Sequence, residues 1–226
     1  AKKALAIALL RTGERTEALE MAREVHARHV RLHGLDHPGT LAAATCLSNS
    51  LRVNDEVDEA FRLAEDTVNR FPKLYGKDHP YTWGCVSNVA LLHRVRGRAD
   101  EARRLNEQAL EGIEKRLGRD HHYSLIIAIN LASDLAMLGE IEAACRLGED
   151  THRRLVALLG ERHPTTLAAA SNLSADLRAA GRVEEAETLF TETMEHYAVT
   201  LGREHPDVQV ALAQRHLDLD IDPPPI

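Results

Sequence analysis

The sequence predicts an all-α protein: a right-handed α-solenoid of helix–turn–helix repeats with about eleven helices. Three observations predict it. A short motif recurs at a fixed interval, each interval holds two amphipathic helical patterns, and no run of β-branched residues alternates with polar ones as a strand would. Aromatic residues make up only 4% of the 226-residue chain, while Ala and Leu abound, which suits close packing of helices.

The recurring motif defines the repeat. The stretch GLDHPGT begins at Gly34, and its counterparts GKDHPYT, GRDHHYS, GERHPTT and GREHPDV begin at Gly76, Gly118, Gly160 and Gly202, so each start follows the last by 42 residues. A second register keeps the same period, at Gly13, Gly97, Gly139 and Gly181, with Asp55 in the vacant slot. We therefore expect one array over residues 1–219, with repeats at 1–35, 36–77, 78–119, 120–161 and 162–203, a capping helix at 204–219, and a proline-rich tail at 220–226.

Each period contains two helices. Residues 80–96, PYTWGCVSNVALLHRVR, carry apolar side chains near i, i+3, i+4 spacing, which predicts a first helix, helix A. GRAD then makes a turn, and residues 99–117 form a second amphipathic pattern, helix B. The motif lies between helix B and the next helix A.

The motif itself is explained by the ends of helices. Its Gly suits the left-handed position after helix B, and its Pro suits the first turn of the next helix, where no N–H is needed. Asp and His precede the Pro as capping candidates, and Thr or Ser follows it. His122 replaces the Pro in the third copy, so the Pro is not essential there.

The acid and imidazole of this motif also resemble a catalytic pair or half of a metal site. However, one imidazole recurs per repeat, and stacked repeats hold such groups about two helix widths apart, roughly 16–20 Å, too far to share one metal ion. The sequence also lacks a GxxxxGK[ST] loop, a GxSxG elbow, HExxH and CxxC. We expect no enzyme, no metal site and no cofactor.

Charge and composition narrow the class of partner. The net charge is −7, so no global basic field favours nucleic acid, and no apolar run approaches the ~20 residues that span a bilayer. Three scattered cysteines predict free thiols in a cytoplasmic protein rather than a disulfide framework. The chain starts without Met and reads directly into a helical pattern, so we expect a cut end inside a larger protein.

The pattern LG-x-D-H-P-x-T-L, then N-L-A, G and E-A, resembles the 42-residue tetratricopeptide repeats of kinesin light chain over essentially the whole chain. The resemblance implies a bacterial, cytoplasmic protein-interaction array at the C-terminus of a larger signalling NTPase. The ending LDLDIDPPPI resembles actinobacterial tetratricopeptide proteins associated with ribosomally made FxSxx-terminated peptides.

A column of asparagines is the strongest clue to a ligand. Asn88, Asn130 and Asn172 share one slot in the middle of helix A, with Cys46 in the preceding repeat. Asn is a poor residue for a helix interior, so its recurrence needs a reason. In the resembling family this Asn faces a concave groove and bonds the backbone of an extended peptide. The alternative is that these amides tie helix A to the neighbouring repeat.

A second column lies six residues further on, at Arg52, Arg94 and Arg178, with Ala136 as the exception. The family register places these side chains toward the groove too, where Arg would bind carboxylates; alternatively they are solvated or paired with acids such as Asp134 and Asp176. The other groove neighbours in this register are Asn49, Ser87, Leu91, Ser133, Met137 and Ser171.

We therefore expect a scaffold that binds an extended protein or peptide segment, acidic or C-terminal, in its groove. The alternative is a structural array that packs against other domains of its parent protein or self-associates. The tail is a disordered end, a cover over the last helix, or a peptide for a neighbour's groove, and its prolines disfavour continued helix.

Overall fold

A computed structural model describes residues 2–222 of the chain. Within these residues there are no strands. The helices, eleven in number, are α1 (Lys2–Arg11), α2 (Arg15–His33), α3 (Pro38–Val53), α4 (Val57–Tyr75), α5 (Pro80–Val95), α6 (Ala99–Leu117), α7 (His122–Met137), α8 (Ile141–Leu159), α9 (Pro164–Ala179), α10 (Val183–Thr200) and α11 (Pro206–Leu212). The predicted all-α solenoid of about eleven helices is confirmed.

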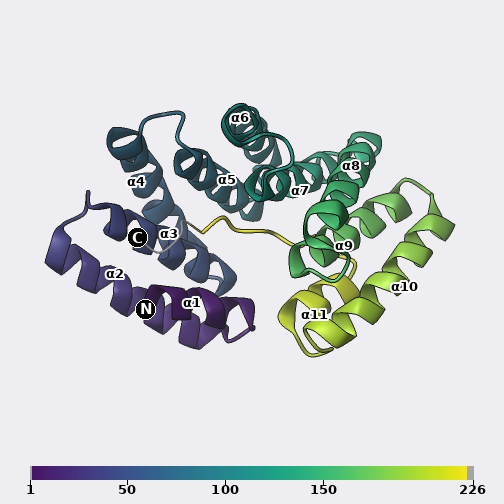
Figure 1. Cartoon of the computed structure of the whole chain (residues 1–226), viewed down its shortest axis with the longest axis horizontal. Coiled ribbons are helices and arrows are strands. Elements are labelled where there is room, and N and C mark those ends of the chain that lie inside the picture. The colour runs from purple at the N-terminus through teal and green to yellow at the C-terminus, as the bar shows by residue number, and fades with distance from the viewer. Residues whose placement is uncertain (1, 223–226) are drawn as a thin grey trace. The chain divides into compact units, whose positions relative to one another are not determined.

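The chain forms two compact units. One contains the residues up to Arg98, with helices α1 to α5, and also the C-terminal residues from Asp220; the other is Ala99–Leu219, with helices α6 to α11. Figure 1 shows the helices of each unit in chain order, each packed against the next through a short turn.

Each unit has two layers of helices. In the first, α1 contacts α3 and α3 contacts α5; in the second, α7 contacts α9 and α9 contacts α11. Even-numbered helices form the other layer: α4 packs against α3 and α5 in the first unit, and α8 packs against α7 and α9 in the second. We call the surface formed by the odd-numbered helices of a unit its odd-helix face.

The recurring motif builds the joint between one helix pair and the next, as predicted. Its five glycines have φ between 78° and 94°, the left-handed region where a Cβ is unfavourable. Five histidines then cap the following helix, because the Nδ1 atom of each accepts a hydrogen bond from the backbone N–H two residues later, at 3.1–3.2 Å. These are His37, His79, His121, His163 and His205.

The core lies between the two layers. In the first unit Leu41 of α3, Phe71 of α4 and Cys85 of α5 form one buried cluster. In the second unit Leu167 of α9 and Tyr197 of α10 pack with α11. Alanines fill the closest approaches: Ala18, Ala60, Ala90, Ala102, Ala109, Ala144 and Ala186 are fully buried. All three cysteines are buried and free.

The C-terminal part differs from its prediction. The capping helix predicted over 204–219 is shorter, since α11 ends at Leu212, and Gln214 then takes a left-handed φ of 53° that turns the chain. Residues 215–222, which we call the tail segment, form no helix. The prolines at 223–225, on which the polyproline prediction rests, lie outside the described residues. No helix of the described chain is long and apolar enough to cross a membrane.

Candidate functional site

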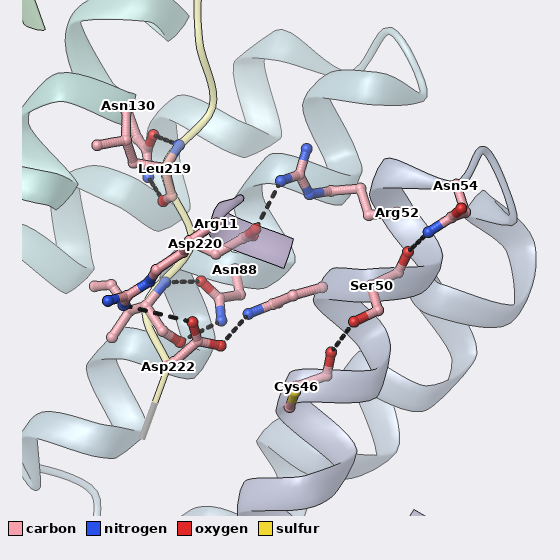
Figure 2. A network of polar contacts seen from close by, with 12 residues as sticks. Arg11, Cys46, Ser50, Arg52, Asn54, Asn88, Asn130, Leu219, Asp220 and Asp222 are labelled. Carbon is pink, nitrogen blue, oxygen red and sulfur yellow. Dashed lines mark hydrogen bonds and ion pairs between the residues drawn. The ribbon is translucent and has the colours of Figure 1, made fainter. Parts of the chain in front are cut away.

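The three asparagines of the predicted column each bind the backbone of the tail segment twice. In the first unit, Asn88 donates to the carbonyl of Ile221 at 2.8 Å and accepts from its N–H at 2.9 Å. In the second unit, Asn130 makes the same pair with Leu219, at 2.8 and 3.1 Å, as Figure 2 shows. An amide side chain is suited to this because it carries both a donor and an acceptor.

The third pair completes the pattern. Asn172 donates to the carbonyl of Leu217 at 3.0 Å and accepts from its N–H at 2.7 Å. All three asparagines are buried, with exposed fractions of 0–4%. The alternative role, tying helix A to the neighbouring repeat, is also represented, by a 3.3 Å bond from Asn172 to Ser133 Oγ.

The register of these bonds is regular. Each step of two residues along the tail segment, from 221 to 219 to 217, is matched by one repeat of 42 residues, from Asn88 to Asn130 to Asn172. A two-residue period is that of an extended chain, whose successive residues face opposite sides. In the preceding repeat the slot holds Cys46, whose thiol lacks the paired donor and acceptor of an amide.

Side chains anchor the tail segment in the second unit. His216 Nε2 lies 2.8 Å from Asp176 Oδ1 of α9, and the carboxyl group of Asp176 is almost fully buried. Leu217 enters the core cluster formed by Leu167 of α9, Tyr197 of α10 and α11. The segment is therefore held by apolar burial and a side-chain hydrogen bond as well as by backbone bonds.

In the first unit the anchors are polar. Arg52 of α3 pairs with Asp220 at 2.9 Å, with side-chain exposures of only 8% and 13%. Asn49 donates to Asp222 at 3.0 Å, and Arg11 of α1 lies 3.9 Å from the same carboxyl group. Figure 2 shows Arg52 and Arg11 directed at these two acids.

Burial changes the acid–base chemistry of this region. The pKa of Asp222 rises from its usual 3.8 to about 6, because the carboxyl group is desolvated and stands near Asp220, which outweighs the favourable effect of Arg11. Desolvation likewise raises the pKa of the Cys46 thiol to about 12, helped by Asp222, and lowers that of Lys3. The Cys46 thiol therefore stays protonated at neutral pH.

The other predicted site residues fall into two groups. Ser87, Leu91, Ser133 and Ser171 are buried on the odd-numbered helices, as is Arg94 of the arginine column. Of the other two, Arg178 pairs with Glu187 of α10 at 2.7 Å, and Met137 at the end of α7 is 56% exposed. Of the two acids named as partners for these arginines, Asp134 accepts from Asn106 and Asp176 pairs with His216.

Sequence reasoning missed the residues of the tail segment itself. The signal was present, because LDLDID alternates apolar and acidic residues with the period of an extended chain. The two-residue period of that alternation is also the period at which the tail segment meets the asparagine column. Among the described residues no cluster of three or more His, Cys, Asp or Glu side chains could hold a metal ion.

Comparisons with known proteins agree with this architecture. Two family models described as tetratricopeptide repeat match the chain, one at residues 4–39 and 40–81, the other at 84–155 and 123–198. No curated protein matches. A solved structure of TPR-like repeats from a kinesin light chain candidate of Podosopora anserina is 26% identical, with a TM-score of 0.64, and the match covers 88% of this chain and 94% of that one.

Two further solved structures share the fold. BtubC (BKLC) from P. vanneervenii is 20% identical over 92% of this chain and 88% of its own, with a TM-score of 0.62. Bacillus thuringiensis PlcR, solved with the peptide PapR7 and DNA, is 13% identical over 88% of this chain and 69% of its own, with a TM-score of 0.73. With one family model alone spanning residues 84–198, the chain belongs to the tetratricopeptide repeat family, and its repeats are of the kinesin-light-chain-like kind.

Proposed function

We propose that this chain is an interaction module that holds an extended protein segment by its backbone on the odd-helix faces. Tetratricopeptide repeats are generally protein–protein interaction modules and a non-catalytic scaffold type. The observation that carries the proposal is the repeated pair of bonds from Asn88, Asn130 and Asn172 to alternate residues of the tail segment.

The chemistry of these pairs suits a binding role. Each asparagine satisfies a backbone N–H and C=O that would otherwise lose their water on burial, and leaving them unpaired costs about 1–3 kcal/mol per group. Every residue except proline carries both a backbone N–H and a C=O. The asparagines therefore recognise an extended backbone rather than a particular sequence. None of these hydrogen bonds requires the bound segment to be covalently attached to the helices. A segment of another protein can therefore form the same bonds.

The attached tail must be weakened before an outside segment can be measured, because a tethered ligand competes at an effective concentration in the millimolar range. The full chain carrying Leu219→Pro and Ile221→Pro does this. It removes the two N–H donors that face Asn130 and Asn88 and leaves every helix residue unchanged. We call it the tail-proline variant, and its helicity is checked by circular dichroism.

The test uses a fluorescein-labelled synthetic peptide of residues 215–222 and fluorescence anisotropy. We expect the peptide to bind the tail-proline variant at least about tenfold more tightly than the unmodified chain. Methylating the peptide nitrogens of Leu219 and Ile221 should weaken binding at least about tenfold, since each lost bond to a buried acceptor costs roughly 1–3 kcal/mol. The matched control is a peptide methylated at Asp220, whose N–H takes no part in the asparagine pairs.

Two results contradict the proposal. One is that no peptide binds, and the other is that the peptide methylated at Leu219 and Ile221 binds as tightly as the unmethylated peptide. If the tail-proline variant does not fold, the unmodified chain serves instead. There, millimolar peptide should accelerate hydrogen exchange at the chain's own Ile221 amide by displacing the tail, and the doubly methylated peptide should not.

A further inference from the structure

Three consecutive tail residues are each held by a different side chain of the first unit. Asp220 is bound by Arg52, the backbone of Ile221 by Asn88, and Asp222 by Asn49. Backbone capture alone would need only the asparagine at position 88. The two flanking contacts are made to the side chains of Asp220 and Asp222. This part of the odd-helix face therefore favours particular residues in the segment that it binds.

The contact to Asp220, the residue before Ile221, is an ion pair shielded from solvent. Arg52 and Asp220 meet at 2.9 Å with both side chains more than four-fifths buried. A buried guanidinium that loses its acid is left with an uncompensated charge, which is far more costly than losing an exposed pair. This position therefore selects an acid and rejects a base.

The aliphatic residue occupies a space that a glycine provides. A Cβ on Gly84 would lie 2.8 Å from Cγ2 of Ile221, closer than real atoms approach, and Ile221 is only 2% exposed. The corresponding slots of the other repeats, 42 and 84 residues away, hold Ala42, Ile126 and Ala168. Only this repeat lacks a side chain there, so Gly84 shapes the space for a β-branched residue.

The contact to Asp222, the residue after Ile221, is likewise specific to one repeat, the one at 36–77. Asn49 donates to Asp222, and its slot is occupied by Leu91, Ser133 and Ala175 in the following repeats. Arg11 adds a positive charge 3.9 Å from the same carboxyl group. An amide and a guanidinium are both suited to an acid at this place.

We propose that α1, α3 and α5 form a binding site for an extended acid–aliphatic–acid triplet, with a β-branched residue at its centre. The chain's own Asp220–Asp222 fills it, and a segment of a partner protein with the same chemistry takes it when the tail is displaced. This proposal rests on the proposed function, to which it adds the class of ligand. Arg52 and Gly84 are its specificity-determining residues: Arg52 excludes a basic residue, and the close fit at Gly84 excludes a large aromatic one.

The experiment uses the tail-proline variant and labelled peptides of residues 215–222 with single changes. Asp220→Lys and Ile221→Trp should each weaken binding at least about a hundredfold, and Asp220→Asn about tenfold. Ile221→Val, which keeps the β-branch, should change binding less than about threefold. Arg215→Ala is the matched control outside the triplet, with no change expected.

Changes in the protein test the same assignments from the other side. Arg52→Glu in the tail-proline variant should reverse the preference, so that the Asp220→Lys peptide binds more tightly than the unchanged one. Gly84→Ala should weaken the unchanged peptide about tenfold and affect the Ile221→Ala peptide much less, because the smaller side chain leaves room for the new methyl group. A merely damaged protein would lose both peptides alike.

The outcomes separate this inference from the proposed function. If all single-change peptides bind equally while methylation of Leu219 and Ile221 still abolishes binding, the triplet site is wrong and backbone capture stands. If no peptide binds, both are wrong. Should the tail-proline variant not fold, Asp220→Lys in the full chain must speed hydrogen exchange at the Ile221 amide, and adding Arg52→Glu must slow it again. Absence of that rescue overturns the proposal.

Discussion

The side chain of Asn88 lies opposite the backbone of Ile221, donating to its carbonyl at 2.8 Å and accepting from its N–H at 2.9 Å, although 133 residues separate the two in the sequence. Both bonds are buried, so each protects a backbone group that has no access to water in this arrangement.

Replacing Asn88 with alanine should therefore undock the end of the tail. The loss of two bonds costs about 2 kcal/mol or more, which should speed hydrogen exchange of the Ile221 amide by at least about tenfold. Asn88→Asp is the matched control: a carboxylate still accepts from the N–H but cannot donate to the carbonyl, so exchange should be intermediate or as fast. Unchanged exchange in Asn88→Ala would show that this pair does not hold the tail.

Docking of the tail should strengthen as the pH falls from about 7 to about 4. The pKa of Asp222 is about 6 when docked and near 3.8 when free, so between these values the docked state binds a proton that the free state lacks. The gain is at most about 3 kcal/mol. The charged and titratable groups that face this carboxyl are Asp220, Arg11, Lys3 and Cys46.

The measurement is hydrogen exchange at the Ile221 amide, corrected for the intrinsic effect of pH on the rate. Asp222→Asn keeps the shape and the contact to Asn49 but cannot titrate, so its docking should lose most of this pH dependence. Equal slopes for the two proteins would show that a group other than Asp222 causes the pH dependence.

The histidine of the joint should contribute to stability as a helix cap. His121→Ala removes the acceptor of the Tyr123 N–H and should lower the free energy of unfolding by about 1 kcal/mol, measured by urea denaturation. His121→Asn offers another capping oxygen and should recover most of the loss. If alanine and asparagine destabilise equally, packing against Tyr123 rather than capping is the contribution of His121.

The turn at Asp55 should be improved by glycine. Asp55 has φ of 64°, a left-handed conformation that the equivalent turns assign to glycine, for example Gly97 at 73°. Asp55→Gly should stabilise the protein by up to about 1 kcal/mol, since the Cβ strain exceeds the entropy that glycine loses. The reverse change, Gly97→Asp, should destabilise by a similar amount, and a higher urea midpoint for Gly97→Asp would refute this.

Much of the fold could be predicted because the repeats are local. The 42-residue spacing, the glycines after each even-numbered helix and the caps before each odd-numbered one depend on residues a few positions apart, so the sequence places them within one or two residues. The asparagine column was visible for the same reason, since a residue unfavourable inside a helix recurs in one slot. The docking of the tail segment could not be predicted, because an alternating LDLDID segment is equally compatible with a disordered end.

The sequence by itself determined the helices, their joints and the slots of Asn88, Asn130 and Asn172. Only the tertiary structure decided what those slots contact: α11 ends at Leu212, the chain turns at Gln214, and residues 217, 219 and 221 meet asparagines 45, 89 and 133 positions away. The physical reason is that a helix is specified by neighbours along the chain. The partner of a side chain exposed on that helix is set by whichever distant segment buries the most apolar surface and satisfies the most polar groups there.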